Sequence, residues 1–214
     1  MKRYIARFVL FIIGLLFAGI GVAFTRHGEL GVSPISSVAN VLNLRFPVLS
    51  MGNWLILWNC ALIVLQVILL RRAFKLFQLL QIPLSFLFGY FTDFGVWIAE
   101  WIPVPNYGMR LVMLFAGILI LGFGIALTVK ADVILNSGEA AVKAISDKSG
   151  HSFGNVKIVF DISCVVLAVI LSLLLFGGQI VGTREGTIIS AVCTGFAVKL
   201  SMWALKRRFL FCDV

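Results

Sequence analysis

Apolar residues along this chain gather into six long runs that are separated by short polar links. Each run is close to the about 20 residues that a helix needs to cross a hydrocarbon layer about 30 Å thick. The pattern therefore predicts six membrane-spanning helices, near residues 7–25, 52–70, 76–99, 110–129, 154–176 and 183–205.

Two shorter and more polar segments, 33–43 and 136–146, follow the first and the fourth run. As helices they would be about 16 Å long, which is too short to span. Ser33 suits the N-cap of the first segment, and Asn136 or Ser137 suits that of the second. Two interpretations are open at this point: amphipathic helices that lie at the membrane interface, or re-entrant half-helices that dip into the protein.

Part of the first run is written twice in the chain. "GLLFAGIGVAFT" at 14–25 and "GILILGFGIALT" at 117–128 share six of twelve residues and lie 103 positions apart. The match continues with "GNWLILWN" at 52–59 and "GNVKIVFD" at 154–161. Matching apolar segments at this distance indicate two related halves of one chain.

The two halves extend over nearly the whole sequence, since Gly89 of "GYFTDF" also aligns with Gly195 of "GFAVKL". We expect a first membrane repeat at 1–100 and a second at 101–214, each with three spans and one short helix, together forming one membrane domain. Because three is an odd number, the second repeat enters the membrane from the opposite side, and the halves are predicted to be inverted. The alternative, in which the short segments also span, gives eight crossings and parallel halves; their length and polarity argue against it.

The composition supports a membrane protein. Hydrophobic residues make up 61% of the chain, charged residues 13%, and the mean hydropathy is +1.07. A soluble domain carries about a quarter charged residues, so the expected partner of this surface is the lipid bilayer. The first run is longer than the apolar core of a signal peptide and belongs to the repeat, so we interpret it as a retained helix.

The basic residues predict the orientation of the chain. They concentrate at the N-terminus, after the second and fourth runs, and in the tail, which are all cytoplasmic if both termini are inside. We therefore expect a multi-pass protein of the bacterial cytoplasmic (inner) membrane, and the net charge of +9 requires no nucleic-acid partner. The residues concerned are Lys2, Arg3, Arg7, Arg71, Arg72, Lys75, Lys130, Lys143, Lys148, Lys206, Arg207 and Arg208.

Signals for catalysis or metal binding are missing from the sequence. Three of the four cysteines lie inside apolar runs, and none has metal-ligand spacing, so we expect no disulfide, metal or cofactor. Neither a metalloprotease motif, nor a nucleophile elbow, nor a phosphate-binding loop is present, and we expect that the protein is not an enzyme. The cysteines are Cys60, Cys164, Cys193 and Cys212.

Four short patterns together resemble the YczE/YitT-like family of bacterial integral membrane proteins. They are "GIGVAF" in the first run, "LGVSP" at 30–34, the "GN" that opens the second run, and "GYFTDF" at 89–94. The resemblance implies a bacterial inner-membrane protein and carries no assigned activity. The second half departs from the first at the turn, where "LNSGE" replaces "GVSP", so strict symmetry of the short helices is not expected.

Polar residues inside spans are costly in lipid and usually face a partner or a water-filled cavity. Asp161 lies in the fifth run, and Lys157 is four residues earlier on the same helical face, so the two can pair. This pair is either structural or a site that binds a cationic group or relays a proton. Asn59 is the counterpart of Asp161, and Asn53 and Asn155 begin the two matched runs.

The N-termini of the two short helices are a second candidate, because half-helix N-termini favour anions. Ser33, Ser36, Ser137 and Gly138 would cradle a carboxylate there, with Glu139 in the first turn of the second helix. The complete set of expected substrate-binding residues is Asp161, Lys157, Asn59, Asn53, Asn155, Asp93, Ser33, Ser36, Ser137, Gly138 and Glu139.

These features predict a small secondary transporter or permease for a small polar or charged organic solute, with its site between the repeats near mid-membrane. Two alternatives stay open: a substrate-binding membrane subunit of a multicomponent importer, and a non-transporting accessory protein. The small-residue helix faces suit a homodimer as well as internal packing.

Overall fold

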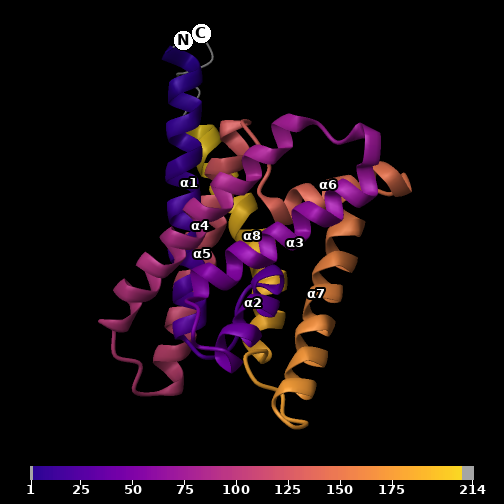
Figure 1. Cartoon of the computed structure of the whole chain (residues 1–214). Coiled ribbons are helices and arrows are strands. Elements are labelled where there is room, and N and C mark those ends of the chain that lie inside the picture. Colours follow the sequence, from indigo (N-terminus) through magenta and orange to yellow (C-terminus); the bar gives the residue numbers. More distant parts are fainter. Residues whose placement is uncertain (1, 209–214) are drawn as a thin grey trace.

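The computed structural model describes residues 2–208, so the expectation for Cys212 lies outside the described residues. All regular structure in this range is helical, and six of the helices are long and apolar enough to span a membrane, as predicted. The chain is therefore an all-α multi-pass membrane protein (Figure 1). The helices are α1 (Lys2–His27), α2 (Pro34–Arg45), α3 (Met51–Leu70), α4 (Gln81–Glu100), α5 (Tyr107–Ala131), α6 (Ser137–Ser149), α7 (Phe153–Leu175) and α8 (Glu185–Arg208), with short 3-10 turns η1 (Arg71–Ala73) and η2 (Leu76–Leu80) before α4.

Local side-chain chemistry sets several helix ends. The Ser50 hydroxyl accepts a hydrogen bond from the Asn53 amide at the start of α3, and the Asn106 side chain accepts one from the Met109 amide at the start of α5. Such caps satisfy backbone donors that have no partner within the helix. Ser33 is the N-cap residue of α2, but its hydroxyl donates to Ser36 Oγ at 3.0 Å and makes no bond to a backbone amide.

Helices α1 and α5 form the centre of the fold and touch through glycines. A Cβ atom at Gly14 would lie 2.7 Å from Thr128 Cγ2, and one at Gly117 would lie 2.6 Å from the backbone nitrogen of Thr25. Gly14 matches Gly117 in the repeat, and Thr25 matches Thr128. The start of each glycine-rich stretch therefore meets the end of the other, so α1 and α5 run antiparallel.

The other helices surround this pair in matching positions. Helix α4 packs against α1 and α8 packs against α5. At the residue level, Gly19 lies on the backbone of α4 at Thr92, and its match Gly122 lies on the backbone of α8 at Ala197. Likewise α2 packs against α7 and α3, while α6 packs against α3 and α7. The match between the halves thus extends from the sequence to the contacts.

One pair of contacts breaks the correspondence. Gly52 of α3 packs directly on Gly89 of α4, and Gly89 also contacts the Ile56 side chain. The matched glycines Gly154 of α7 and Gly195 of α8 have no atom within 4 Å of the position that a Cβ would take. The α3–α4 contact is therefore closed, whereas the corresponding faces of α7 and α8 are apart.

The ends of the helices define two sides of the molecule (Figure 1). The side with the start of α1 and the α3–α4 link carries basic residues such as Arg71 and Lys75, and we call it the basic side. The opposite side carries the 101–106 and 176–184 links, and we call it the cavity side. The N-terminal ends of the two short helices meet, because a Cβ at Gly138 of α6 would lie 2.8 Å from the Ile35 side chain of α2.

Candidate functional site

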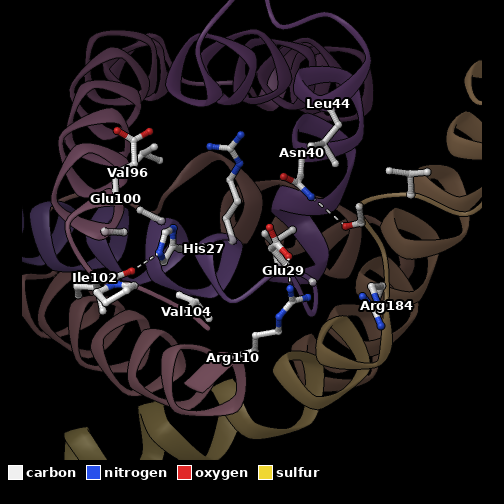
Figure 2. Close-up of a pocket in the computed structure, with 18 of the residues that line it drawn as sticks. His27, Glu29, Asn40, Leu44, Val96, Glu100, Ile102, Val104, Arg110 and Arg184 are labelled. Carbon is white, nitrogen blue, oxygen red and sulfur yellow. Dashed lines mark hydrogen bonds and ion pairs between the residues drawn. The ribbon is translucent and has the colours of Figure 1, made fainter. Parts of the chain in front are cut away.

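A cavity of about 820 Å³ opens on the cavity side of the molecule. It lies between the C-terminal ends of α1 and α4, the start of α5, the side of α2 and the 180–184 link. Figure 2 shows side chains from these elements around the opening, with Glu100 on the α4 wall and Asn40 on the α2 wall. The apolar part of the lining includes Val32, Leu44, Val96, Ile102, Val104 and Ile180.

The cavity is lined by three arginines, two of which have a carboxylate of their own. Arg110 pairs with Glu29 at 2.9 Å, and Arg184 lies 3.4 Å from Glu185. Arg26 has no carboxylate within 4 Å among residues 2–208. Its guanidinium is therefore a charge that faces the cavity without a countercharge in direct contact.

Arg26 is held in place by α2. Its Nη2 donates to Asn43 Oδ1 at 2.6 Å, and Asn43 Nδ2 in turn donates to the Leu49 carbonyl at 2.8 Å. Asn43 is buried, so its amide is a fixed support for the arginine. This bond uses one of the five donors of the guanidinium, and the remaining donors are available for a planar anion.

Two acidic residues lie near enough for their charges to act on Arg26. Asp93 already accepts hydrogen bonds from Ser50 Oγ at 2.5 Å and from the Gly52 amide at 2.7 Å. Glu100 lines the cavity at the exposed end of α4 and forms no salt bridge within the described part of the chain. Glu100 is therefore the carboxylate that is free to meet a solute.

Polar groups without partners lie beside the cavity. Asn40 of α2 donates to the Gly182 carbonyl at 2.9 Å, whereas its buried Oδ1 accepts no hydrogen bond within residues 2–208 (Figure 2). The buried hydroxyls of Thr183, just before α8, and of Thr187 and Ser190 in α8 also have no hydrogen-bond partner within residues 2–208. Buried polar groups are rarely left without partners, so this region is suited to a polar solute or to water.

The other end of the same interface is closed. On the basic side, a pocket of only about 20 Å³ is lined by Val129, Ile134 and Leu135. In the repeat these residues match Arg26, Gly31 and Val32, which line the large cavity. Equivalent surfaces of the two halves are thus open on the cavity side and shut on the basic side.

Comparison with known proteins assigns the chain at this point. A family model described as "Family of unknown function (DUF6198)" matches residues 5–202. The chain belongs to the DUF6198 family. It is also 27% identical over 203 residues to "Uncharacterized membrane protein YczE" of Bacillus subtilis (strain 168), covering 94% of this chain and 87% of the relative. The resemblance to YczE-like membrane proteins is thereby confirmed, and no solved structure matches the chain.

The DUF6198 chain places its sequence-predicted charged pair away from the cavity. Lys157 Nζ and Asp161 Oδ1 are 2.7 Å apart on α7, as the spacing predicts, but neither residue lines the cavity. Asn59 is buried in α3 with an unpartnered Nδ2 within residues 2–208. Asn53 and Asn155 are exposed at the starts of α3 and α7, which lie on opposite sides of the molecule, so the structure does not bring them together.

The residues predicted at the short-helix N-termini also do not form one cluster. Ser33 and Ser36 bond to each other, and Gly138 lies against Ile35. Glu139 lines the small pocket on the basic side. No residue of the predicted set lines the cavity, and Asp93 accepts its hydrogen bonds at the start of α3.

Ser137 belongs to a buried polar cluster on the basic side that the sequence analysis missed. Its carbonyl accepts from Gln66 Nε2 at 3.1 Å, and its hydroxyl lies 3.1 Å from Ser85 Oγ. Gln66 and Gln81 exchange two amide hydrogen bonds of 3.1 Å. These mutual bonds satisfy the amides and connect α3, α4 and α6 on the closed side of the fold.

Sequence reasoning also missed Arg26, Asn40 and Glu100 as site residues. Arg26 follows an uninterrupted apolar run and lies in the last turn of α1. A basic residue there is ordinary, because it suits the helix dipole and can extend to the membrane interface. Nothing in the sequence therefore singles out Arg26 or places Glu100 near it.

Proposed function

We propose that this DUF6198 protein is a secondary transporter for a small charged organic solute, which enters through the cavity. The observation that carries the proposal is the difference in volume between the pockets at two matched surfaces of the halves. The pocket on the cavity side measures about 820 Å³ and the pocket on the basic side about 20 Å³. In transporters with inverted repeats, exchanging the conformations of the two halves closes one side and opens the other. The antiparallel contact between α1 and α5 is the geometry that this mechanism needs.

The placement of the short helices supports the same proposal. Most residues of α2 are buried, and the N-terminal ends of α2 and α6 meet inside the protein. This arrangement favours re-entrant half-helices over helices at the membrane interface. Under the orientation predicted from the basic residues, the cavity opens to the outside of a bacterial cytoplasmic membrane and the basic side faces the cytoplasm.

Labelling from one side tests the inverted arrangement. Val48 and His151 match each other in the repeat and are both exposed, so they are suitable labelling positions. In a background without native cysteines, we expect a membrane-impermeant thiol reagent to label Val48→Cys in intact cells and His151→Cys only after permeabilisation. Labelling of both in intact cells would contradict the inversion.

Uptake into proteoliposomes tests the transport function. Radiolabelled amino acids, organic acids and amines form the panel, and we expect uptake of at least one of them above that of protein-free liposomes. Val104→Trp places an indole in the cavity and is expected to lower the initial rate by about tenfold or more, equivalent to about 1.4 kcal/mol. The matched control is Val48→Trp, because Val48 is 92% exposed and does not line the cavity.

The absence of uptake by folded, correctly inserted protein would contradict the transporter. A substrate-binding subunit of a multicomponent importer would present a similar cavity, and co-purification with an ATPase would favour that function. An accessory protein is favoured if Val104→Trp has no effect on any flux while core substitutions only reduce the amount of folded protein.

A further inference from the structure

We propose that the cavity binds a zwitterionic amino acid with an apolar side chain, its carboxylate on Arg26 and its ammonium group on Glu100. This inference deepens the proposed function and rests on the cavity being the point where the solute enters. The carrying observation is that, within residues 2–208, the other two arginines of the lining have carboxylates in direct contact and Arg26 has none.

Arg26 recognises the carboxylate of the amino acid. An arginine fork binds a carboxylate through two parallel N–H···O bonds, which are short and stronger than neutral hydrogen bonds. Asn43 occupies one donor of Nη2 and fixes the guanidinium in the cavity wall. A partly buried charge is costly unless it meets a countercharge or water, and within residues 2–208 no carboxylate contacts Arg26, so a solute carboxylate can supply that countercharge.

Glu100 recognises the ammonium group of the amino acid. It lines the same cavity and acts electrostatically on Arg26, yet the two do not approach within 4 Å. Two opposite charges that are near but not in contact leave a gap between them. An amino acid carries its carboxylate and ammonium on the same carbon atom, so in this cavity it can present one charge to Arg26 and the other to Glu100.

The remaining lining fits the rest of such a molecule. Apolar side chains from four different segments border the cavity, among them Leu44, Val96 and Val104. Ligand sites of this kind combine a mostly apolar wall with a few polar groups that fix orientation. The unpartnered Oδ1 of Asn40 is an additional acceptor for an ammonium group.

Binding to the purified, full-length protein in detergent tests the inference with three probes. L-leucine carries both charges, 4-methylpentanoate lacks the ammonium group, and isoamylamine lacks the carboxylate. We expect calorimetry to give a Kd for leucine that is about tenfold or more below that of either analogue, since each loses a charge-assisted bond.

Variants assign the two ends. Arg26→Gln is expected to weaken leucine binding by about tenfold or more, and Arg26→Lys to weaken it less, because lysine keeps the charge without the fork. Glu100→Gln is expected to lower the affinity for leucine to that for 4-methylpentanoate and to leave the latter unchanged. Arg45→Gln and Asp147→Asn, which remove charges outside the cavity, are the matched controls.

Several results would overturn the inference: equal binding of leucine and 4-methylpentanoate, stronger binding of isoamylamine, no effect of Glu100→Gln, or no binding of leucine to folded protein. Failure of the transporter is a different outcome. Leucine binding that depends on Arg26, without uptake into proteoliposomes, would contradict transport and support the inference. Uptake of another solute without leucine binding would support transport and contradict the amino-acid inference.

Discussion

Replacing Gly117 with valine is expected to destabilise the folded protein strongly. A Cβ at this position would lie 2.6 Å from the backbone nitrogen and 2.7 Å from the methyl group of Thr25, so α1 and α5 must separate along their central contact. Overpacking costs about 1–3 kcal/mol, and contact with backbone atoms puts this site at about 3 kcal/mol. That cost lowers the apparent Tm by roughly 6–12 °C for a chain of this length. Fluorescence-detected size exclusion and thermal denaturation in detergent measure the effect.

The control is the same substitution at Gly195 of α8. Both glycines lie in apolar spans, but no atom lies within 4 Å of a Cβ built at Gly195. Gly195→Val is expected to fold with an apparent Tm close to that of the unaltered protein. If the two variants lose stability equally, glycine matters through helix propensity and not through the α1–α5 contact.

A disulfide between positions 158 and 195 is expected to form only when the protein reaches its second conformation. In the described state, Ile56 of α3 contacts Gly89 of α4, whereas the matched positions Ile158 of α7 and Gly195 of α8 face open space. Exchange of the two half-conformations would bring α7 onto α8 and move α3 away from α4. Oxidation of the double variant Ile158→Cys/Gly195→Cys, followed by mobility on a denaturing gel, reports this contact.

The matched control is Ile56→Cys/Gly89→Cys, which replaces a contact that is already formed. It is expected to crosslink readily without solute, and each disulfide is expected to stop transport, because the two lock opposite states. Crosslinking of 158 to 195 should change in extent when a transported solute is present. If it never forms under oxidising conditions while 56 to 89 does, α7 and α8 do not come together and alternation between the halves is wrong.

The candidate site in the structure is the cavity, and the Lys157–Asp161 pair that the sequence suggested lies outside it. The Lys157–Asp161 pair satisfies itself on one face of α7, as i,i+4 pairs on a helix can. Arg26 and Glu100 come from different helices and leave a gap that a solute can fill. A charge that has found its partner within its own helix is therefore weaker evidence for a site than one that has not.

The sequence by itself determined the membrane class, the six spans, the two short helices and the doubled pattern of the halves. These features depend on local properties: the length and apolarity of a run, the capping residue before a helix, and similarity between two stretches of one chain. They are readable because lipid imposes the same length and apolarity on any helix that crosses it.

Tertiary structure alone decided which faces meet, and with them the cavity. A spanning helix is apolar both toward lipid and toward its neighbours, so periodicity does not reveal its inner face as it does in a soluble protein. Each of these features depends on residues far apart in the chain. They are the antiparallel contact of Gly14 with Thr128, the open faces at Gly154 and Gly195, and the cavity that Arg26 and Glu100 both line. The space left at one end of the bundle and closed at the other results from packing the halves against each other, which no single segment encodes.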